Sequence, residues 1–308
     1  MKVLITGSSG QIGTNVGLAL LERGDAVEGV DLRRNAWTDR IPTRILDLAK
    51  AAPGELSSSR DLSVVLHFAA HAKVFELVEH PERALANIQM LFTALEFARL
   101  NRLPFIFASS REVYGDIHRH VTDESAADFV VAESPYSASK IAGEALIYSY
   151  ASCYKLPYLV FRFSNVYGRF DCDIERMERV VPLFARRIAR GEPIVIYGRE
   201  KVLDFTYYAD AVSGVLRGID LLVQRRLSGQ TFNLAFGQGN SLTDVVNILG
   251  LALGRTPQVS YEPARPGEVM RYVADISKAR ELLGYEPQTP LSAGLPRSVA
   301  WQRELGVL

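Results

Sequence analysis

The chain has 308 residues, of which 48% are hydrophobic and 23% charged, a balance typical of a globular protein with a sizeable core. Its 35 Lys and Arg residues equal its 35 Asp and Glu residues, so the net charge of zero gives no support for a nucleic-acid or anionic-membrane partner. No apolar run reaches the ~18 residues that a membrane span needs. Two cysteines, Cys153 and Cys172, lack metal-site spacing, so we expect free thiols, no bound metal and a cytoplasmic location. Because a strand is expected to begin at residue 2, we expect no signal peptide.

The first predicted element is a strand, a glycine-rich turn and a helix start, in KVLITGSSGQIG at 2–13. Gly7, Gly10 and Gly13 follow the apolar run with GxxGxxG spacing. The first glycine permits a tight turn, the second lets backbone approach a pyrophosphate, and the third lets the helix pack closely on the strand. Amides at the helix start would hold the phosphates. This context predicts a dinucleotide-binding site.

Strand candidates then alternate with helical segments. The expected strands are Ala26–Val30, Arg44–Leu46, Val64–Phe68, Phe105–Ala108 and Tyr158–Phe163, and the expected helices are Pro81–Arg99 and Ser134–Tyr154. This alternation predicts an α/β fold with a doubly wound parallel sheet of the Rossmann type. After about residue 165 the pattern loosens, and we expect a smaller unit packed on the first. There, Arg176–Arg190 is expected to form a helix with a solvated basic face.

Asp31 ends the second expected strand. An acidic residue there accepts hydrogen bonds from the adenosine ribose hydroxyls and repels a 2′-phosphate, which favours NAD over NADP. Arg33 and Arg34 follow at once and could bind that phosphate instead. We give the carboxylate more weight and expect NAD.

Tyr136 and Lys140 form a YxxxK pair on an expected helix, so both lie on one face. A nearby ammonium, together with a cationic nicotinamide, is expected to lower the pKa of the phenol so that a phenolate acts near neutral pH. Tyr197 and Lys201 repeat this spacing, but Gly198 and a preceding strand-like run indicate a coincidence in a loop.

Ser110 lies just past an expected strand, at the sheet edge where α/β proteins bind ligands. Its hydroxyl could hydrogen-bond both a substrate hydroxyl and the phenolate. Asn87 lies in the middle of the preceding helix although asparagine is a poor helix former, and is interpreted either as a surface residue or as a polar anchor beneath the site.

These motifs together resemble the extended short-chain dehydrogenase/reductase family, in particular nucleotide-sugar epimerases and dehydratases of the UDP-galactose 4-epimerase type. The resemblance spans nearly the whole chain and rests on TGSSGQIG at 6–13, HFAA at 67–70, SSREVYG at 109–115, YSASK at 136–140, RFSNVYG at 162–168 and RPGE at 265–268. It implies a Rossmann domain of residues 1–165, with about 204–236, that binds NAD. Residues 166–203 and 237–308 would form the smaller α/β domain that binds the sugar nucleotide.

The resemblance also assigns roles to residues. It implies catalysis by Ser110, Tyr136, Lys140 and Glu112, and no metal. The implied cofactor-binding residues are Gly7, Gly10, Gln11, Ile12, Gly13, Asp31, Arg33, Asp47, Leu48, Phe68, Ala69, Ala70, Asn87, Tyr136, Lys140 and Phe163. The implied substrate-binding residues are Lys73, Ser110, Arg111, Asn165, Arg265 and Glu268, with Arg265 on the pyrophosphate.

Two departures from the family pattern affect these expectations. Leu203 occupies a position where family epimerases usually have an arginine, so Arg199 or Lys201 would have to supply a diphosphate contact. Arg111 and Glu112 follow Ser110 where simple epimerases have small residues. Glu112 matches the dehydratase and decarboxylase branches, but the acid that dehydratases place before it is absent, and an arginine does not release a proton near neutral pH. The two residues could instead pair with each other, or Arg111 could hold a uronate carboxylate.

The resemblance therefore implies an NAD-dependent 4-epimerase that acts on a UDP-sugar or UDP-uronate through a 4-keto intermediate. An NDP-sugar dehydratase, a UDP-glucuronate decarboxylase and, remotely, a non-catalytic dinucleotide-sensing regulator are the alternatives. We also expect a homodimer, because the expected helices near 84–99 and 137–154 carry wide faces of small and apolar residues. The resemblance implies that these helices pair with those of a second copy.

Overall fold

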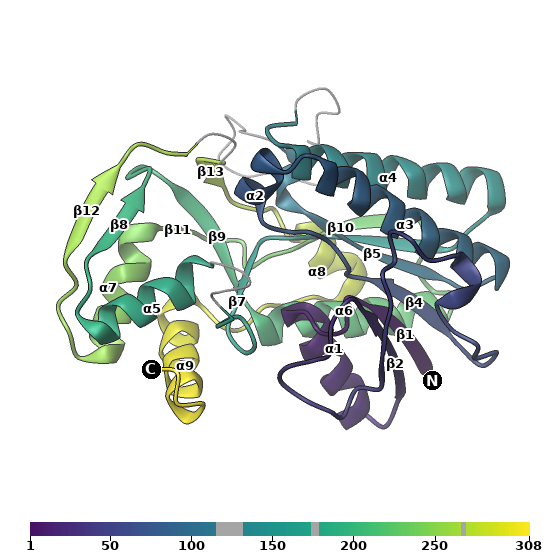
Figure 1. The fold of residues 1–308 in the computed structure, drawn as a ribbon, viewed down its shortest axis with the longest axis horizontal. Helices are drawn as coiled ribbons and strands as arrows, with labels where there is room; N and C mark the ends of the chain where they lie inside the picture. Colours follow the sequence, from purple (N-terminus) through teal and green to yellow (C-terminus); the bar gives the residue numbers. More distant parts are fainter. Residues whose placement is uncertain (115–131, 174–178, 266–268) are drawn as a thin grey trace.

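The computed structural model describes residues 1–114, 132–173, 179–265 and 269–308, and its largest element is a seven-stranded parallel sheet (Figure 1). The strand order is β10-β6-β5-β4-β1-β2-β3. The strands are β1 Lys2–Thr6, β2 Ala26–Asp31, β3 Thr43–Ile45, β4 Val64–His67, β5 Phe105–Ser110, β6 Tyr158–Phe163 and β10 Gln230–Leu234. The order reverses between β1 and β4, and such a switch point leaves a crevice at the carboxyl ends of the strands. The sheet confirms the predicted Rossmann-type fold.

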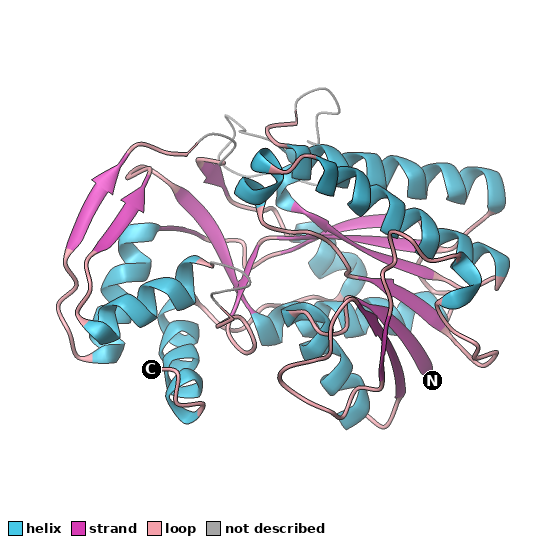
Figure 2. Cartoon of the chain, in the orientation of Figure 1, coloured by secondary structure: helices cyan, strands magenta, loops and turns pink. Residues whose placement is uncertain are grey.

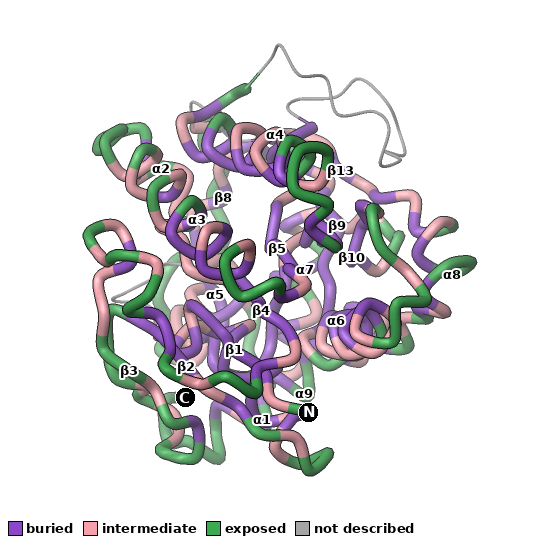
Figure 3. Tube along the Cα trace, turned by 90° about the vertical axis from the view of Figure 1, so that its right-hand side faces the viewer, coloured by how far each residue is buried: buried purple, intermediate pink, exposed green. Residues whose placement is uncertain are grey.

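Helices cover both faces of this sheet because its strands are apolar on both sides. Helices α3 (Glu82–Leu100) and α4 (Pro135–Tyr154) lie on one face, and α1 (Gln11–Glu22) and α6 (Tyr208–Val223) lie on the other (Figure 1). One core contains Leu91 and Ile147 from α3 and α4, and a second contains Val16 and Val215 from α1 and α6. Figure 3 shows β1, β4 and β5 buried between these layers. No helix in the described part of the chain is long and apolar enough to span a bilayer.

A smaller α/β unit lies beside the carboxyl ends of the central strands (Figure 2). Strand β9 (Val202–Tyr207) pairs with β7 (Asn165–Tyr167), β11 (Gly239–Ser241) and β13 (Arg271–Tyr272), and β8 (Ile194–Tyr197) pairs with β12 (Val259–Glu262). Helices α5 (Val180–Arg190), α7 (Leu242–Leu253) and α9 (Leu291–Glu304) share one core, to which Phe184, Leu249 and Leu295 contribute. The remaining elements are α2 (Val74–Glu79), α8 (Ser277–Leu283) and 3-10 turns at Pro53–Glu55 and Arg111–Tyr114.

The packing of α8 differs from the two-part division that the sequence predicts. Ala279, Leu283 and Tyr285 belong to the same core as α6 and β10, although the predicted division places 237–308 in the smaller unit. The division itself stays a prediction. Within the expected helix at 176–190, α5 begins at Val180, and residues 176–178 lie outside the described ranges.

Three aromatic side chains join the segment between β2 and β3 to the C-terminal helix. The ring of Trp37 lies 5.6 Å from that of Phe170 and 6.2 Å from that of Trp301 on α9. Phe170 and Trp301 meet edge to face at 5.5 Å. Phe170 has a φ of 63°, in the left-handed region that non-glycine residues seldom adopt. The cluster therefore holds the segment after β7 in an unusual backbone conformation beside the cavity described next.

Candidate active site

A cavity of about 890 Å³ lies at the carboxyl ends of the central strands. Its walls come from the glycine turn, the segments after β2, β4 and β5, the start of α4, and β7, β8 and β9 of the smaller unit. It gathers every predicted site residue except Asn87 and Glu268, and Glu268 lies outside the described residues.

The glycine turn forms one end of the cavity. Gly7 has a φ of 75°, and a Cβ on it would lie 2.6 Å from the backbone nitrogen of Ala69. A Cβ on Gly13 would overlap the carbonyl oxygen of Gly7, so both positions require glycine. Helix α1 begins at Gln11 without a capping side chain and without an acidic residue in its first turn. Its first amides therefore line the cavity as donors for an anion, which fits the pyrophosphate of a dinucleotide.

Asp31 is held rigidly beside this turn. One carboxylate oxygen accepts the N–H of Ser9 at 3.0 Å, and the other accepts the N–H of Arg33 at 3.1 Å. Asp31, Arg33, Asp47 and Leu48 all line the cavity. A carboxylate has about four acceptor sites, so Asp31 retains acceptors for ribose hydroxyls.

Asn87 is placed differently from the implied cofactor contact. Its amide oxygen accepts the N–H of His71 at 2.7 Å, and its amide nitrogen donates to the carbonyl of His71 at 3.0 Å and to Ser139 at 3.3 Å. These bonds occupy both ends of the amide and hold it behind the wall formed by Phe68, Ala69 and Ala70. Asn87 is buried and thus anchors the wall, which is the second of the two interpretations that the sequence left open.

The expected catalytic side chains meet at one point on this wall. Helix α4 is capped by Ser134, whose hydroxyl accepts the N–H of Ser137 at 3.1 Å, and this places Tyr136 in the first turn. The Tyr136 phenol is hydrogen-bonded to Ser110 at the end of β5. The ammonium of Lys140 lies 5.6 Å from the Tyr136 ring centroid and donates to the carbonyl of Ala108 at 2.7 Å.

Burial controls the proton affinities of this pair. It raises the pKa of Tyr136 to about 12, although the hydrogen bond from Ser110 and the charges of Arg179 and Arg111 oppose the rise. Burial lowers the pKa of Lys140 to about 8, against the charge of Glu144. Burial therefore opposes the lowering of the phenol pKa that the sequence predicts. That expectation also includes the charge of a bound nicotinamide, so it stays a prediction.

Arg111 and Glu112 form an ion pair directly after Ser110. Arg111 Nη2 lies 2.9 Å from Glu112 Oε1 and donates to the amide oxygen of Asn165 at 3.4 Å. The guanidinium also lies over the ring of Tyr272, 5.7 Å from its centroid. The alternative that the two residues pair with each other is thus confirmed, and both still line the cavity.

The smaller unit contributes aromatic and basic side chains. The guanidinium of Arg265 lies over the ring of Tyr197 at 4.0 Å and faces Phe75 of α2 at 5.7 Å. Lys201 lines the cavity near Leu203, whereas Arg199 is not among the lining residues and lies over Tyr261. Lys201 is therefore the better placed substitute for the arginine that Leu203 replaces.

Sequence reasoning missed several cavity residues. Tyr197 and Lys201 are not on a helix, as expected, yet both line the cavity, as does Phe75. Arg179 and Arg187 also line it, although their segment was expected to present a solvated basic face. Arg179 donates to Gln11, the first residue of α1, and, at 3.0 Å, to the carbonyl of Val166. Position at the end of a strand is the one signal that could have identified Tyr197.

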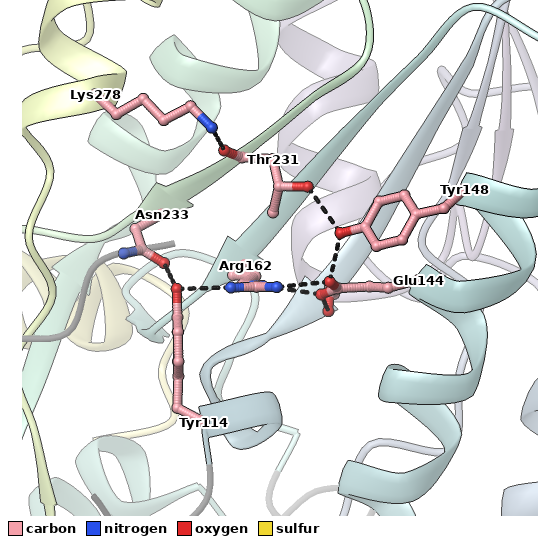
Figure 4. A network of polar contacts seen from close by, with 8 residues as sticks. Tyr114, Glu144, Tyr148, Arg162, Thr231, Asn233 and Lys278 are labelled. Atoms are coloured by element: carbon pink, nitrogen blue, oxygen red, sulfur yellow. Dashed lines mark hydrogen bonds and ion pairs between the residues drawn. The ribbon is translucent and has the colours of Figure 1, made fainter. Parts of the chain in front are cut away.

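A buried polar network lies behind the catalytic wall (Figure 4). Arg162 of β6 donates to both carboxylate oxygens of Glu144 on α4, at 2.9 and 2.7 Å. Glu144 also accepts from Ser109, the neighbour of Ser110, at 2.5 Å, and from Tyr148 at 2.8 Å. On the other side Arg162 donates to the hydroxyl of Tyr114 at 2.9 Å. The network continues from Tyr114 to Asn233, and from Tyr148 through Thr231 to Lys278. It thereby connects β5, β6, α4 and β10 beneath Ser110.

Known proteins resemble the chain over its full length. UDP-glucuronate 4-epimerase 1 of Arabidopsis thaliana is 32% identical over 98% of this chain and 76% of its own. The structure of a UDP-glucose 4-epimerase of Thermotoga maritima with UDP-glucose superposes with a TM-score of 0.90, at 30% identity, over 99% of both chains. A UDP-glucuronic acid 4-epimerase of Bacillus cereus, in complex with UDP-glucuronic acid and NAD, gives a TM-score of 0.88 at 26% identity over 99% of this chain and 100% of its own.

The geometry of the site and the similarity to these proteins both indicate a dinucleotide-binding enzyme family. The glycine cradle, the uncapped start of α1 and Asp31 suit a dinucleotide, and the described residues contain no group of three or more metal-ligating side chains. The model of the NAD dependent epimerase/dehydratase family matches residues 3–235, which is most of the chain. This chain therefore belongs to the NAD dependent epimerase/dehydratase family, a branch of the extended short-chain dehydrogenases/reductases.

Proposed function

We propose that this chain is an NAD-dependent nucleotide-sugar 4-epimerase that acts on a UDP-sugar or UDP-uronate through a transient 4-keto sugar. The observation that carries the proposal is the meeting of Ser110, Tyr136 and Lys140 on the wall of the cavity that also contains the glycine turn. The names of the relatives support it, since they act on UDP-glucose or UDP-glucuronic acid at C4.

The protein's residues have distinct parts in this reaction. Tyr136 exchanges a proton with the C4 hydroxyl, and Ser110, hydrogen-bonded to the phenol, orients that hydroxyl. NAD, when bound, would supply the hydride acceptor and donor chemistry by which C4 is inverted. Lys140 keeps donors beyond its bond to the Ala108 carbonyl, which it offers to the phenol and to the nicotinamide ribose.

The cofactor is expected to bind at the end of the cavity formed by the glycine turn, and the substrate at the end formed by the smaller unit. Gly7, Gly10 and Gly13 with the start of α1 hold the cofactor pyrophosphate, and Asp31 binds the adenosine ribose. Lys73, Arg265 and Lys201 supply positive charge for the diphosphate of the sugar nucleotide. Arg265 is suited to this task because its planar fork can donate two parallel hydrogen bonds to a phosphate. The rings of Phe75 and Tyr197 lie against its guanidinium and help to orient it.

The phenol of Tyr136 provides the direct test. Tyr136→Phe is expected to keep binding of NAD and UDP-sugar but to lose roughly 10²–10⁴-fold in turnover, because the proton transfer is lost. Products from UDP-glucose and UDP-glucuronate would be followed by NMR and mass spectrometry. Tyr154→Phe, the same substitution in the last turn of α4, is a matched control, since Tyr154 is exposed and far along the helix from the site.

The outcomes separate the branches of the family. A product of the same mass as the substrate with inverted C4, formed by wild type and Tyr154→Phe but not Tyr136→Phe, supports the 4-epimerase. A product lighter by one water identifies a dehydratase, and one lighter by carbon dioxide a decarboxylase; either result without a 4-epimer overturns the proposal. Wild-type turnover in Tyr136→Phe refutes the role of the phenol.

A further inference from the structure

In the ion pair of Arg111 and Glu112, one nitrogen of the guanidinium and one oxygen of the carboxylate have no hydrogen-bond partner among the described residues. Arg111 Nη2 is used by Glu112 and Asn165, whereas Nη1 is buried and has no hydrogen-bond partner among the described residues. Glu112 Oε1 faces Arg111, whereas Oε2 is likewise buried without a partner in the described part of the chain. The Glu112 side chain is only 7% exposed. The pair therefore offers one unused donor and one unused acceptor next to Ser110, on the cavity wall.

A second acidic residue also acts on Arg111. Besides Glu112, the buried carboxyl of Asp204 interacts with this guanidinium. Asp204 accepts the N–H groups of Phe236, Gly237 and Ala274 at 3.0, 2.9 and 3.3 Å. Burial raises the pKa of Asp204 to about 6, while these bonds and the charge of Arg111 lower it, so the group is mostly ionised at neutral pH. Two carboxyl groups thus interact with one guanidinium, Glu112 as an ion pair and Asp204 through its charge.

The unpartnered atoms and the nearby carboxyl groups favour a hydroxyl over a carboxylate as the substrate group that binds here. A second carboxylate brought to Arg111 would meet Glu112 at close range and would leave Oε2 without a donor, because both groups only accept hydrogen bonds. A hydroxyl both donates and accepts, so it satisfies Oε2 and Nη1 together. A site built to bond a hydroxyl disfavours an analogue that leaves its buried polar atoms unpaired.

We infer that the Arg111–Glu112 pair faces the substituent on C5 of the sugar, next to the reacting C4, and selects a neutral hydroxymethyl group there, so that the preferred substrate is a neutral UDP-hexose rather than a UDP-uronate. This inference rests on the proposed function and narrows it. It runs against the name of the Arabidopsis thaliana relative, a UDP-glucuronate 4-epimerase, and against the sequence-based alternative in which Arg111 holds a uronate carboxylate.

The test compares UDP-glucose with UDP-glucuronate on the same purified, NAD-loaded protein. We expect kcat/KM for 4-epimerisation to be at least tenfold higher for UDP-glucose, which corresponds to about 1.4 kcal/mol. Calorimetric binding of both compounds to Tyr136→Phe, which holds substrate without turning it over, is expected to show the same order. A preference for UDP-glucuronate in either measurement overturns the inference and leaves the 4-epimerase standing. Absence of any C4 inversion overturns the proposed function, and the binding comparison still decides the inference.

A variant connects the preference to the pair. Glu112→Gln removes one negative charge with little change in shape, so Arg111 becomes available to a carboxylate, and we expect the ratio between the two substrates to narrow by at least about fivefold. Glu304→Gln removes a charge of the same sign from an exposed position on α9 and should leave the ratio unchanged. An unchanged ratio in Glu112→Gln also overturns the inference. Should that variant not fold, the binding comparison on Tyr136→Phe remains decisive.

Discussion

Glu144→Gln tests the buried network beneath Ser110. The side chains of Arg162 and Glu144 are only 4% and 5% exposed, and two charged hydrogen bonds of 2.9 and 2.7 Å join them. Removing the charge of Glu144 leaves the guanidinium buried without its counterion. Charge-assisted hydrogen bonds contribute about 1.5–3 kcal/mol each, and breaking a buried pair from one side costs about 3–5 kcal/mol. We therefore expect the free energy of unfolding to fall by about 4 kcal/mol.

Far-UV circular dichroism during denaturant and thermal unfolding measures this change. For 308 residues, an entropy of unfolding of about 2.1 cal/mol/K per residue converts each kcal/mol to about 1.5 °C, so Tm should fall by roughly 6 °C. Glu22→Gln is the matched control, because Glu22 pairs with Arg40 at 3.9 Å where both side chains are more than half exposed. That pair should contribute no more than about 1 kcal/mol.

A double variant distinguishes lost pairing from lost packing. Replacing both Glu144 and Arg162 with Met removes the unpaired charge, so the double variant should be more stable than Glu144→Gln. The reasoning is refuted if Glu144→Gln costs less than about 1 kcal/mol, or if the double variant is the less stable of the two.

Three further predictions follow from the structure. NADP should bind at least tenfold more weakly than NAD, because Asp31 would face its 2′-phosphate; equal dissociation constants by calorimetry would contradict this assignment and favour Arg33. The chain should form a homodimer through α3 and α4, since Leu85 and Phe92, two turns apart on α3, are 70% and 43% exposed; sedimentation of only a 34.1 kDa species at micromolar protein would refute it. Burial raises the pKa of Asp171 from 3.8 to about 6, so the folded protein binds this proton more tightly than the unfolded chain does. The free energy of unfolding is therefore expected to be highest, with respect to this group, below pH 3.8 and to fall as the pH rises through about 6. In Asp171→Asn the free energy of unfolding should depend less on pH between these two values. The same pH dependence in the variant as in wild type, measured by denaturant unfolding, would contradict this prediction.

The parts of the site that follow from local sequence were predictable. The glycine turn needs Gly7 and Gly13 because backbone crosses backbone there, and this requirement is visible as spacing in the sequence. Ser110 and Asp31 follow strands, and the carboxyl ends of parallel strands meet at one edge, so their placement on one cavity wall follows from the order of the elements.

The remaining features depend on packing between distant segments. Arg179 enters the cavity because its segment folds back onto Gln11, and no local pattern distinguishes such an arginine from a solvated one. Asn87 turns its amide to His71 instead of to a ligand because the wall behind the cavity needs those bonds. The raised pKa of Tyr136 was missed for the same reason, since desolvation is a property of the whole fold.

The aromatic cluster gives the molecule a local optical signal. The chain has two tryptophans, and both lie in contact with Phe170, at the junction between the segment after β2 and helix α9. Trp37 and Phe170 also line the cavity. Tryptophan emission therefore reports on this single junction, and any ligand or substitution that shifts the segment after β7 will change the emission while the central sheet stays intact. Quenching titrations can then follow events at the cavity without an introduced dye.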